Sequence, residues 1–218
     1  MTAFAAADHP AVAMNILFKL TRRQVLDFGR SADAVATWES LDAETQDWLW
    51  SGSAVFWEYL GLVFEAYVRF GRFDKAEQFA LGFLDDSAVP STGLPFIGIP
   101  YARELMRRNR ATEGLALFTR LSESAPRHSW CAWAWYWLAL AALINEDMGK
   151  AHEFANRIRA AQGIHSKLYD EWELGGKALL LLADLQPSGI DPQETQYSSA
   201  QLAELVAEIN ADLNRITQ

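Results

Sequence analysis

The residues that could take part in chemistry are scattered along this chain. Its four histidines fall in no His-Glu-x-x-His or other ligand spacing, so neither a metal site nor a cofactor is predicted. No glycine-rich phosphate-binding loop is present. The single cysteine, Cys131, lies inside an apolar run, where a buried thiol acts as a small hydrophobic side chain.

Paired carboxylates are the remaining catalytic candidates, because two acids in a cleft can act as general acid and base. The pairs are Asp85 with Asp86, Glu58 with Glu65, and Asp170 with Glu173. The first pair opens a stretch rich in Pro and Gly, residues 85–98, which is predicted to be a loop. An enzyme with a site near this loop is one hypothesis. Solvated or helix-capping carboxylates are the other, and the sequence nominates no catalytic residue.

The charge balance excludes two classes of partner. The 218 residues include 19 basic and 28 acidic ones, a net charge of -9, whereas phosphate backbones and anionic membranes require basic surfaces. The apolar run 130–144 is shorter than the roughly 20 residues of a membrane span, so none is predicted. We expect no signal peptide, since the first ten residues lack a basic region, and a lone cysteine suits a reducing cytoplasm.

The clearest structural pattern is a helical hairpin over 129–163. On its first helix, small and large apolar residues recur at the i, i+3, i+4, i+7 spacing of one helical face. A polar break at 145–149 separates them from a matching stripe on the second helix. Alanines on facing stripes allow two antiparallel helices to approach closely. The residues are Trp135, Leu138, Ala139 and Ala142, then Ala151, Ala155 and Ile158.

This hairpin resembles the tetratricopeptide repeat (TPR), whose pattern is Trp-x2-Leu-Gly-x2-Tyr, then Ala-x3-Phe. Here Trp135-x2-Leu138-Ala139-x2-Ala142 matches the first part. The best copy is Tyr67-x3-Gly71-Arg72-Phe73-Asp74-Lys75-Ala76. The small residue that opens each second helix recurs at intervals of 42, 38 and 37 residues, at Ala34, Ala76, Gly114 and Ala151.

The resemblance implies an all-α fold, an antiparallel helix-hairpin array forming a TPR-like right-handed α-solenoid with a C-terminal capping helix. One domain over 1–218 is predicted, with hairpins at about 10–42, 53–85, 96–124 and 129–163. Degenerate or capping helices are predicted at 165–186 and 198–216, the last opening on a Ser198-x-x-Gln201 capping box.

The resemblance also implies function, since the first helix of each hairpin would line a concave groove. We predict a non-enzymatic adaptor or scaffold that binds a protein or peptide there. Trp, Tyr and Arg often dominate interface energies. Either the aromatic members line the groove or the Trp130–Trp137 cluster fills the core against the last two helices. The predicted groove residues are Glu58, Glu65, Arg69, Arg103, Met106, Arg107, Trp133, Tyr136 and Leu140.

Two further interpretations stay open at this stage. The chain could be a dedicated chaperone or an immunity-type partner of a secreted protein, since small acidic proteins fit that role. It could also form homo-oligomers through an apolar patch containing Trp48 and Trp50. Some TPR proteins bind the C-terminal carboxylate of heat-shock chaperones through Lys and Asn. Here Glu58, Gly61 and Glu65 occupy that face, so this activity is not expected.

Overall fold

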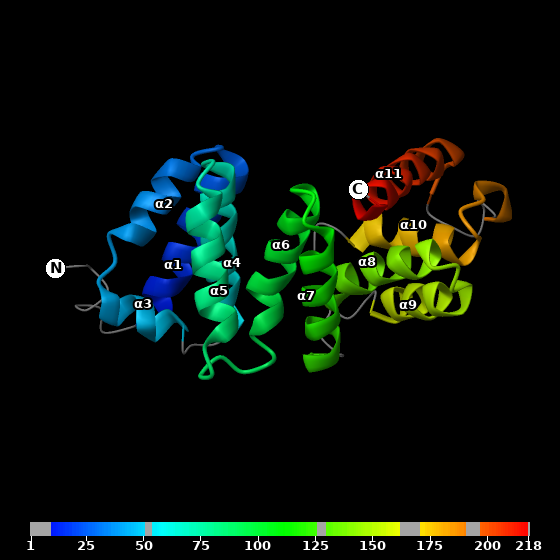
Figure 1. Ribbon diagram of the computed structural model, residues 1–218. Helices are drawn as coiled ribbons and strands as arrows, with labels where there is room; N and C mark the ends of the chain where they lie inside the picture. Colours follow the sequence, from blue (N-terminus) through cyan, green and yellow to red (C-terminus); the bar gives the residue numbers. More distant parts are fainter. Residues whose placement is uncertain (1–9, 51–53, 126–129, 162–170, 191–196, 218) are drawn as a thin grey trace. The chain divides into compact units, whose positions relative to one another are not determined.

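The computed structural model describes residues 10–50, 54–125, 130–161, 171–190 and 197–217, and these are α-helical with short connections. Figure 1 shows the helices packed as successive hairpins. The helices are α1 (Pro10–Arg22) with a π-helical extension η1 (Arg23–Asp27), α2 (Ser31–Glu39), α3 (Ala43–Trp50), α4 (Ala54–Arg69), α5 (Phe73–Asp85), α6 (Leu94–Arg107), α7 (Ala111–Ser124), α8 (Cys131–Ile144), α9 (Met148–Ala161), α10 (Glu171–Leu182), a 3-10 turn η2 (Pro187–Gly189) and α11 (Ser199–Thr217).

The hairpins share one turn geometry. Two residues after the end of η1, α4, α6, α8 and α10 comes a residue with positive φ. These residues are Gly29, Gly71, Asn109, Glu146 and Asp184. At the last four turns the next backbone N–H donates to the carbonyl five residues earlier, as in Arg72 to Tyr67 at 2.9 Å. The first turn differs, because the N–H of Arg30 bonds to Gln24, six residues back, after the π-helical turn adds one residue.

The residues that pack between helices lie at fixed distances in the sequence from these turn residues. Five residues after each of the first four turn positions comes a buried small residue, and these are the four that the sequence identifies: Ala34, Ala76, Gly114 and Ala151. Residues nine positions after the turn are buried too, namely Trp38, Ala80, Phe118 and Ala155. Each repeat therefore combines a turn residue with positive φ and buried residues at fixed distances after it in the sequence.

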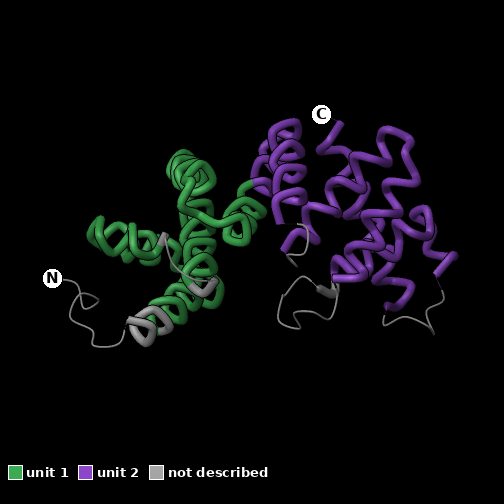
Figure 2. Tube along the Cα trace, turned by 90° about the horizontal axis from the view of Figure 1, so that it is seen from below, with its two compact units in different colours: residues 1–101 green, residues 102–218 purple. Residues whose placement is uncertain are grey.

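The chain falls into two compact units, residues 1–101 and 102–218, and the boundary lies within α6 (Figure 2). In the first unit α4 is central and packs against α1, α2, α3 and α5. The Gly61 position shows how closely its backbone is packed, because a Cβ there would lie 2.8 Å from the carbonyl oxygen of Phe96. Asp42 caps α3, since its Oδ1 accepts a hydrogen bond from the N–H of Thr45 at 2.8 Å.

The predicted loop over 85–98 is confirmed for 86–93 and is wrong at both ends. Helix α5 includes Asp85, and α6 already begins at Leu94, so the connection is only 86–93. Pro95 is tolerated because the first helical turn needs no N–H donor there. Phe96, Ile97 and Ile99 are buried, and their packing outweighs the local breaker signals of Gly98 and the prolines.

In the second unit, α8 and α9 form the hairpin predicted around the tryptophans, and α10 packs against both. Helix α11 contacts α8 and α10, so these two helices lie between α9 and α11 (Figure 1). The capping box of α11 is confirmed. The Ser198 N–H donates to Gln201 Oε1 at 2.9 Å, and the Gln201 N–H donates to Ser198 Oγ at 3.3 Å. The start of the predicted 165–186 helix and the end of the predicted 129–163 hairpin lie outside the described residues.

Candidate protein-binding surface

The predicted groove residues of the first unit are charged and lie on α4. Arg69 donates hydrogen bonds to Glu65 Oε1 at 2.6 and 2.9 Å, and both side chains are partly exposed. Glu58 is half-buried. An exposed i, i+4 pair contributes only about 0.3–0.5 kcal/mol. The pair is therefore accessible, and Arg69 is also held by a 3.5 Å hydrogen bond from its Nη1 to the Val25 carbonyl.

The aromatic and aliphatic groove residues of the second unit are buried. Tyr136, Leu140 and Met106 are fully buried, and Trp133 is 8% exposed. Trp135 and Trp137 are also buried, and Trp137 stacks on Phe118 with ring centroids 6.2 Å apart. The described tryptophan side chains of α8 therefore belong to the core, whereas Trp130, which precedes α8, is partly exposed.

Two predicted arginines remain at the surface beside this core. The Arg103 Cζ atom lies 3.7 Å from the centroid of the Trp133 ring, a cation–π contact. Arg107, one turn later on α6, is more exposed and lies 3.5 Å from Glu104. Glu104 is itself nearly buried and accepts a 2.9 Å hydrogen bond from Arg108. The result is a guanidinium held over an indole, with a second one nearby on the same helix.

A polar cluster joins α8, α10 and α11 behind this surface. Its centre is Lys177, only 3% exposed, whose Nζ lies 2.5 Å from Glu173, 3.0 Å from Glu208 and 3.7 Å from Asp212. The ammonium also lies 5.0 Å from the centroid of the Tyr136 ring. A buried ammonium needs such partners, because desolvation alone would favour its neutral form.

Asp212 connects the cluster to α8. Its Oδ2 accepts a 2.8 Å hydrogen bond from the Tyr136 hydroxyl, and its Oδ1 is paired with Arg215. Burial raises the pKa of Tyr136 well above its usual range, and the neighbouring Asp212 carboxylate raises it further. The phenol is therefore a neutral hydrogen-bond donor at physiological pH.

Lys177 and Asp212 are not among the residues predicted from the sequence, although the sequence carries a signal for both. Asp212 continues the apolar stripe Leu202, Leu205 and Ile209, and Lys177 lies within the mostly apolar stretch 174–182. A charged residue on a buried helical stripe requires a partner. Which elements supply the partners is not visible in the sequence, because they come from α8 and α10 for Asp212 and from α11 for Lys177.

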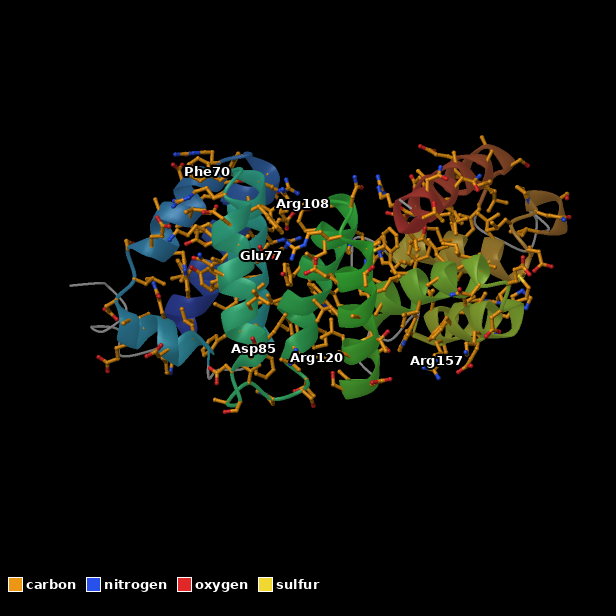
Figure 3. The ribbon with its side chains drawn as sticks, in the orientation of Figure 1. Phe70, Glu77, Asp85, Arg108, Arg120 and Arg157 are labelled. Carbon is orange, nitrogen blue, oxygen red and sulfur yellow. The ribbon has the colours of Figure 1, made fainter. Side chains whose placement is uncertain are left out.

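The Cys131 thiol is not activated as a nucleophile. Burial raises the pKa of the Cys131 thiol to about 12, and the thiol donates to the Ala125 carbonyl at 3.3 Å. Asp85 is exposed at the end of α5 (Figure 3). Asp170 lies outside the described residues. Over the described ranges, no three His, Cys, Asp or Glu side chains are grouped as metal ligands, and no helix is long and apolar enough to cross a membrane.

Comparison with known proteins identifies the fold. No family model and no curated protein matches the sequence. A solved structure described as TPR-like repeats of a kinesin light chain from Podosopora anserina superposes with a TM-score of 0.51. It is 16% identical, and the match covers 96% of this chain and 99% of that one. The fold is therefore TPR-like, as the sequence pattern predicts.

Proposed function

We propose that this chain is a non-enzymatic protein-interaction module, an adaptor or scaffold in a reducing cytoplasm. The TPR-like fold supports it, because arrays of this kind typically bind proteins. The buried and unpaired state of Cys131 agrees with the compartment. The chemistry of the buried groups agrees as well, since the thiol and the Tyr136 phenol are held in their neutral, protonated forms.

The observation that carries the proposal is the arrangement of Arg103, Trp133 and Arg107. The cation–π contact with Trp133 orders one guanidinium before any partner arrives, which lowers the entropy lost on binding. Arg107 is exposed one turn away. Arginine presented in this manner forms paired hydrogen bonds to carboxylates. The surface therefore fits a protein segment that carries an acidic side chain or a terminal carboxylate.

The test begins with photo-crosslinking. A photoreactive amino acid replaces Arg107, or Arg157 as a matched position, in the full chain inside cells. Arg157 lies on the side of α9 turned away from α8 (Figure 3) and has a similar ion pair, 2.6 Å to Glu153. We expect a crosslinked protein from position 107 that is absent from position 157.

The partner is then purified and its affinity measured by calorimetry. Arg103→Glu with Arg107→Glu is expected to raise Kd by about ten-fold or more, because rim charges now repel the partner's carboxylates. Arg157→Glu should change Kd by less than about two-fold. Equal effects of the two variants would refute this surface, and turnover of a substrate by the purified chain would refute the non-enzymatic assignment.

A further inference from the structure

Helix α11 occupies the side of the second unit where a partner would be expected. It contacts α10 and α8. Helix α8 is the first helix of its hairpin, and first helices line the concave side in the repeat that the chain resembles. Its buried residues Leu202, Leu205 and Ile209 form one stripe. Its remaining surface is mostly exposed, for example at Ala203, Glu204 and Asn210. The helix is therefore held on one face only.

The surface beneath α11 is shaped for a helix. At Gly176 of α10 a Cβ atom would lie 2.3 Å from Leu205 Cδ1 and 2.9 Å from Tyr197 Cε1. Both side chains therefore enter space that is open only because residue 176 is glycine. This notch accepts one apolar side chain of α11, as the pockets of helix-binding grooves do.

The contact is also unusually polar. The seams inside the hairpins are built from alanine and large apolar residues, whereas α11 is anchored by Lys177 to Glu208 and Asp212 and by Tyr136 to Asp212. Buried ion pairs contribute little net stability compared with apolar packing, but they select a register and a partner. Such a contact is specific, and it loses much of its stability when one of its charged partners is removed.

We propose that α11 is a displaceable, built-in ligand of the groove formed by α8 and α10. The ligand that displaces it is an amphipathic helix of the same chemistry. That helix carries apolar residues with the spacing of Leu202, Leu205 and Ile209 and an acidic residue at the Asp212 position. This inference deepens the proposed function and rests on it for the identity of the external partner, but its test uses no external partner.

The test uses a fluorescent synthetic peptide of residues 197–217 and the full chain. In the unmodified chain the tethered α11 is present at an effective concentration of roughly millimolar, so micromolar peptide should not bind. Asp212→Lys places a cation against Lys177 and should release α11, after which the peptide binds with a micromolar Kd. The matched control is Glu204→Lys, which makes the same charge change on the exposed face and should leave the groove closed.

Two additions make the result decisive. A peptide with Asp212→Lys, or a chain carrying both Asp212→Lys and Gly176→Leu, should show at least about ten-fold weaker binding, because the anchor or the notch is lost. In the unmodified chain, hydrogen exchange of α11 amides should be at least about ten-fold faster than that of α8 amides, reporting opening of α11 alone.

Three results would overturn the proposal. The first is equal protection of α11 and α8, which would make α11 an inseparable part of the core. The second is loss of the α8–α10 structure in the Asp212→Lys chain, with the same meaning. The third is a released α11, seen by exchange, without peptide binding. Failure of the Arg103 and Arg107 test would leave all these measurements unchanged, so the two proposals fail separately.

Discussion

The Tyr136 hydroxyl and the Asp212 carboxylate, 76 positions apart in sequence, form a 2.8 Å hydrogen bond that ties α8 to α11. The bond lies beside the Lys177 ammonium and among three carboxylates. Tyr136 is predicted from the sequence to contact a partner, but this hydrogen bond makes it part of the interior. The Tyr136 hydroxyl is therefore not available to a partner while α11 is in place.

Replacing Lys177 with alanine should strongly destabilise the second unit. The change leaves Asp212 buried with Tyr136 and Arg215 but without the ammonium, and removing one partner from a buried ion pair costs about 3–5 kcal/mol. We expect a value near the lower end, since Glu173 and Glu208 are partly exposed. Urea unfolding followed by circular dichroism measures the loss.

Lys150→Ala provides the control for this prediction. Lys150 has the same side chain, pairs with Asp147 at 3.2 Å and is 68% exposed. Its replacement should change the free energy of unfolding by no more than about 0.5 kcal/mol. A similar loss of unfolding free energy in the two variants would show that the burial of Lys177 does not increase its contribution to stability.

Replacing Glu146 with glycine should stabilise the protein by about 1 kcal/mol. Glu146 has φ of 58° at the α8–α9 turn, where the first two hairpins use glycine. The left-handed conformation costs an ordinary residue about 1–2 kcal/mol, and glycine avoids most of that cost. Thermal unfolding checks the shift.

The same substitution at Glu153, in the interior of α9, should have the opposite sign. Glycine there costs about 1 kcal/mol of helix propensity and removes the exposed pair with Arg157. A destabilising Glu146→Gly would contradict the shared turn geometry.

Stability should fall between pH 9 and pH 12, partly because of Cys131. Burial raises the pKa of this thiol from an ordinary 9.0 to about 12. Above pH 9 the unfolded chain therefore loses a proton that the folded chain keeps, so rising pH favours unfolding. The slope is up to about 1.4 kcal/mol per pH unit for one such group.

Cys131→Ala isolates this contribution. Its free energy of unfolding, measured in urea from pH 8 to pH 11, should fall less steeply than that of the parent chain. Burial also raises the pKa of Tyr67 to about 12, but this residue is present in both proteins and cancels in the comparison. Parallel pH curves would mean that the folded protein does not protect the thiol.

The sequence by itself determined the repeated hairpins, because each depends on residues close together in the chain. Turn residues with positive φ and the small residues Ala34, Ala76, Gly114 and Ala151 stand in a fixed local register. Helix propensity, capping and the apolar stripe act over one or two helical turns. Such features can be read without knowing where distant segments lie.

Only the tertiary structure decided which residues beside the apolar stripes are buried and which are exposed. The start of α6 follows the burial of Phe96 and Ile97 rather than the nearby Gly and Pro. Helix α11 supplies the hydrogen-bond acceptor of the buried Tyr136 hydroxyl, and it also supplies carboxylates for Lys177. The position of α11 depends on contacts between residues far apart in the chain, and local residue patterns carry no information about distances of that kind.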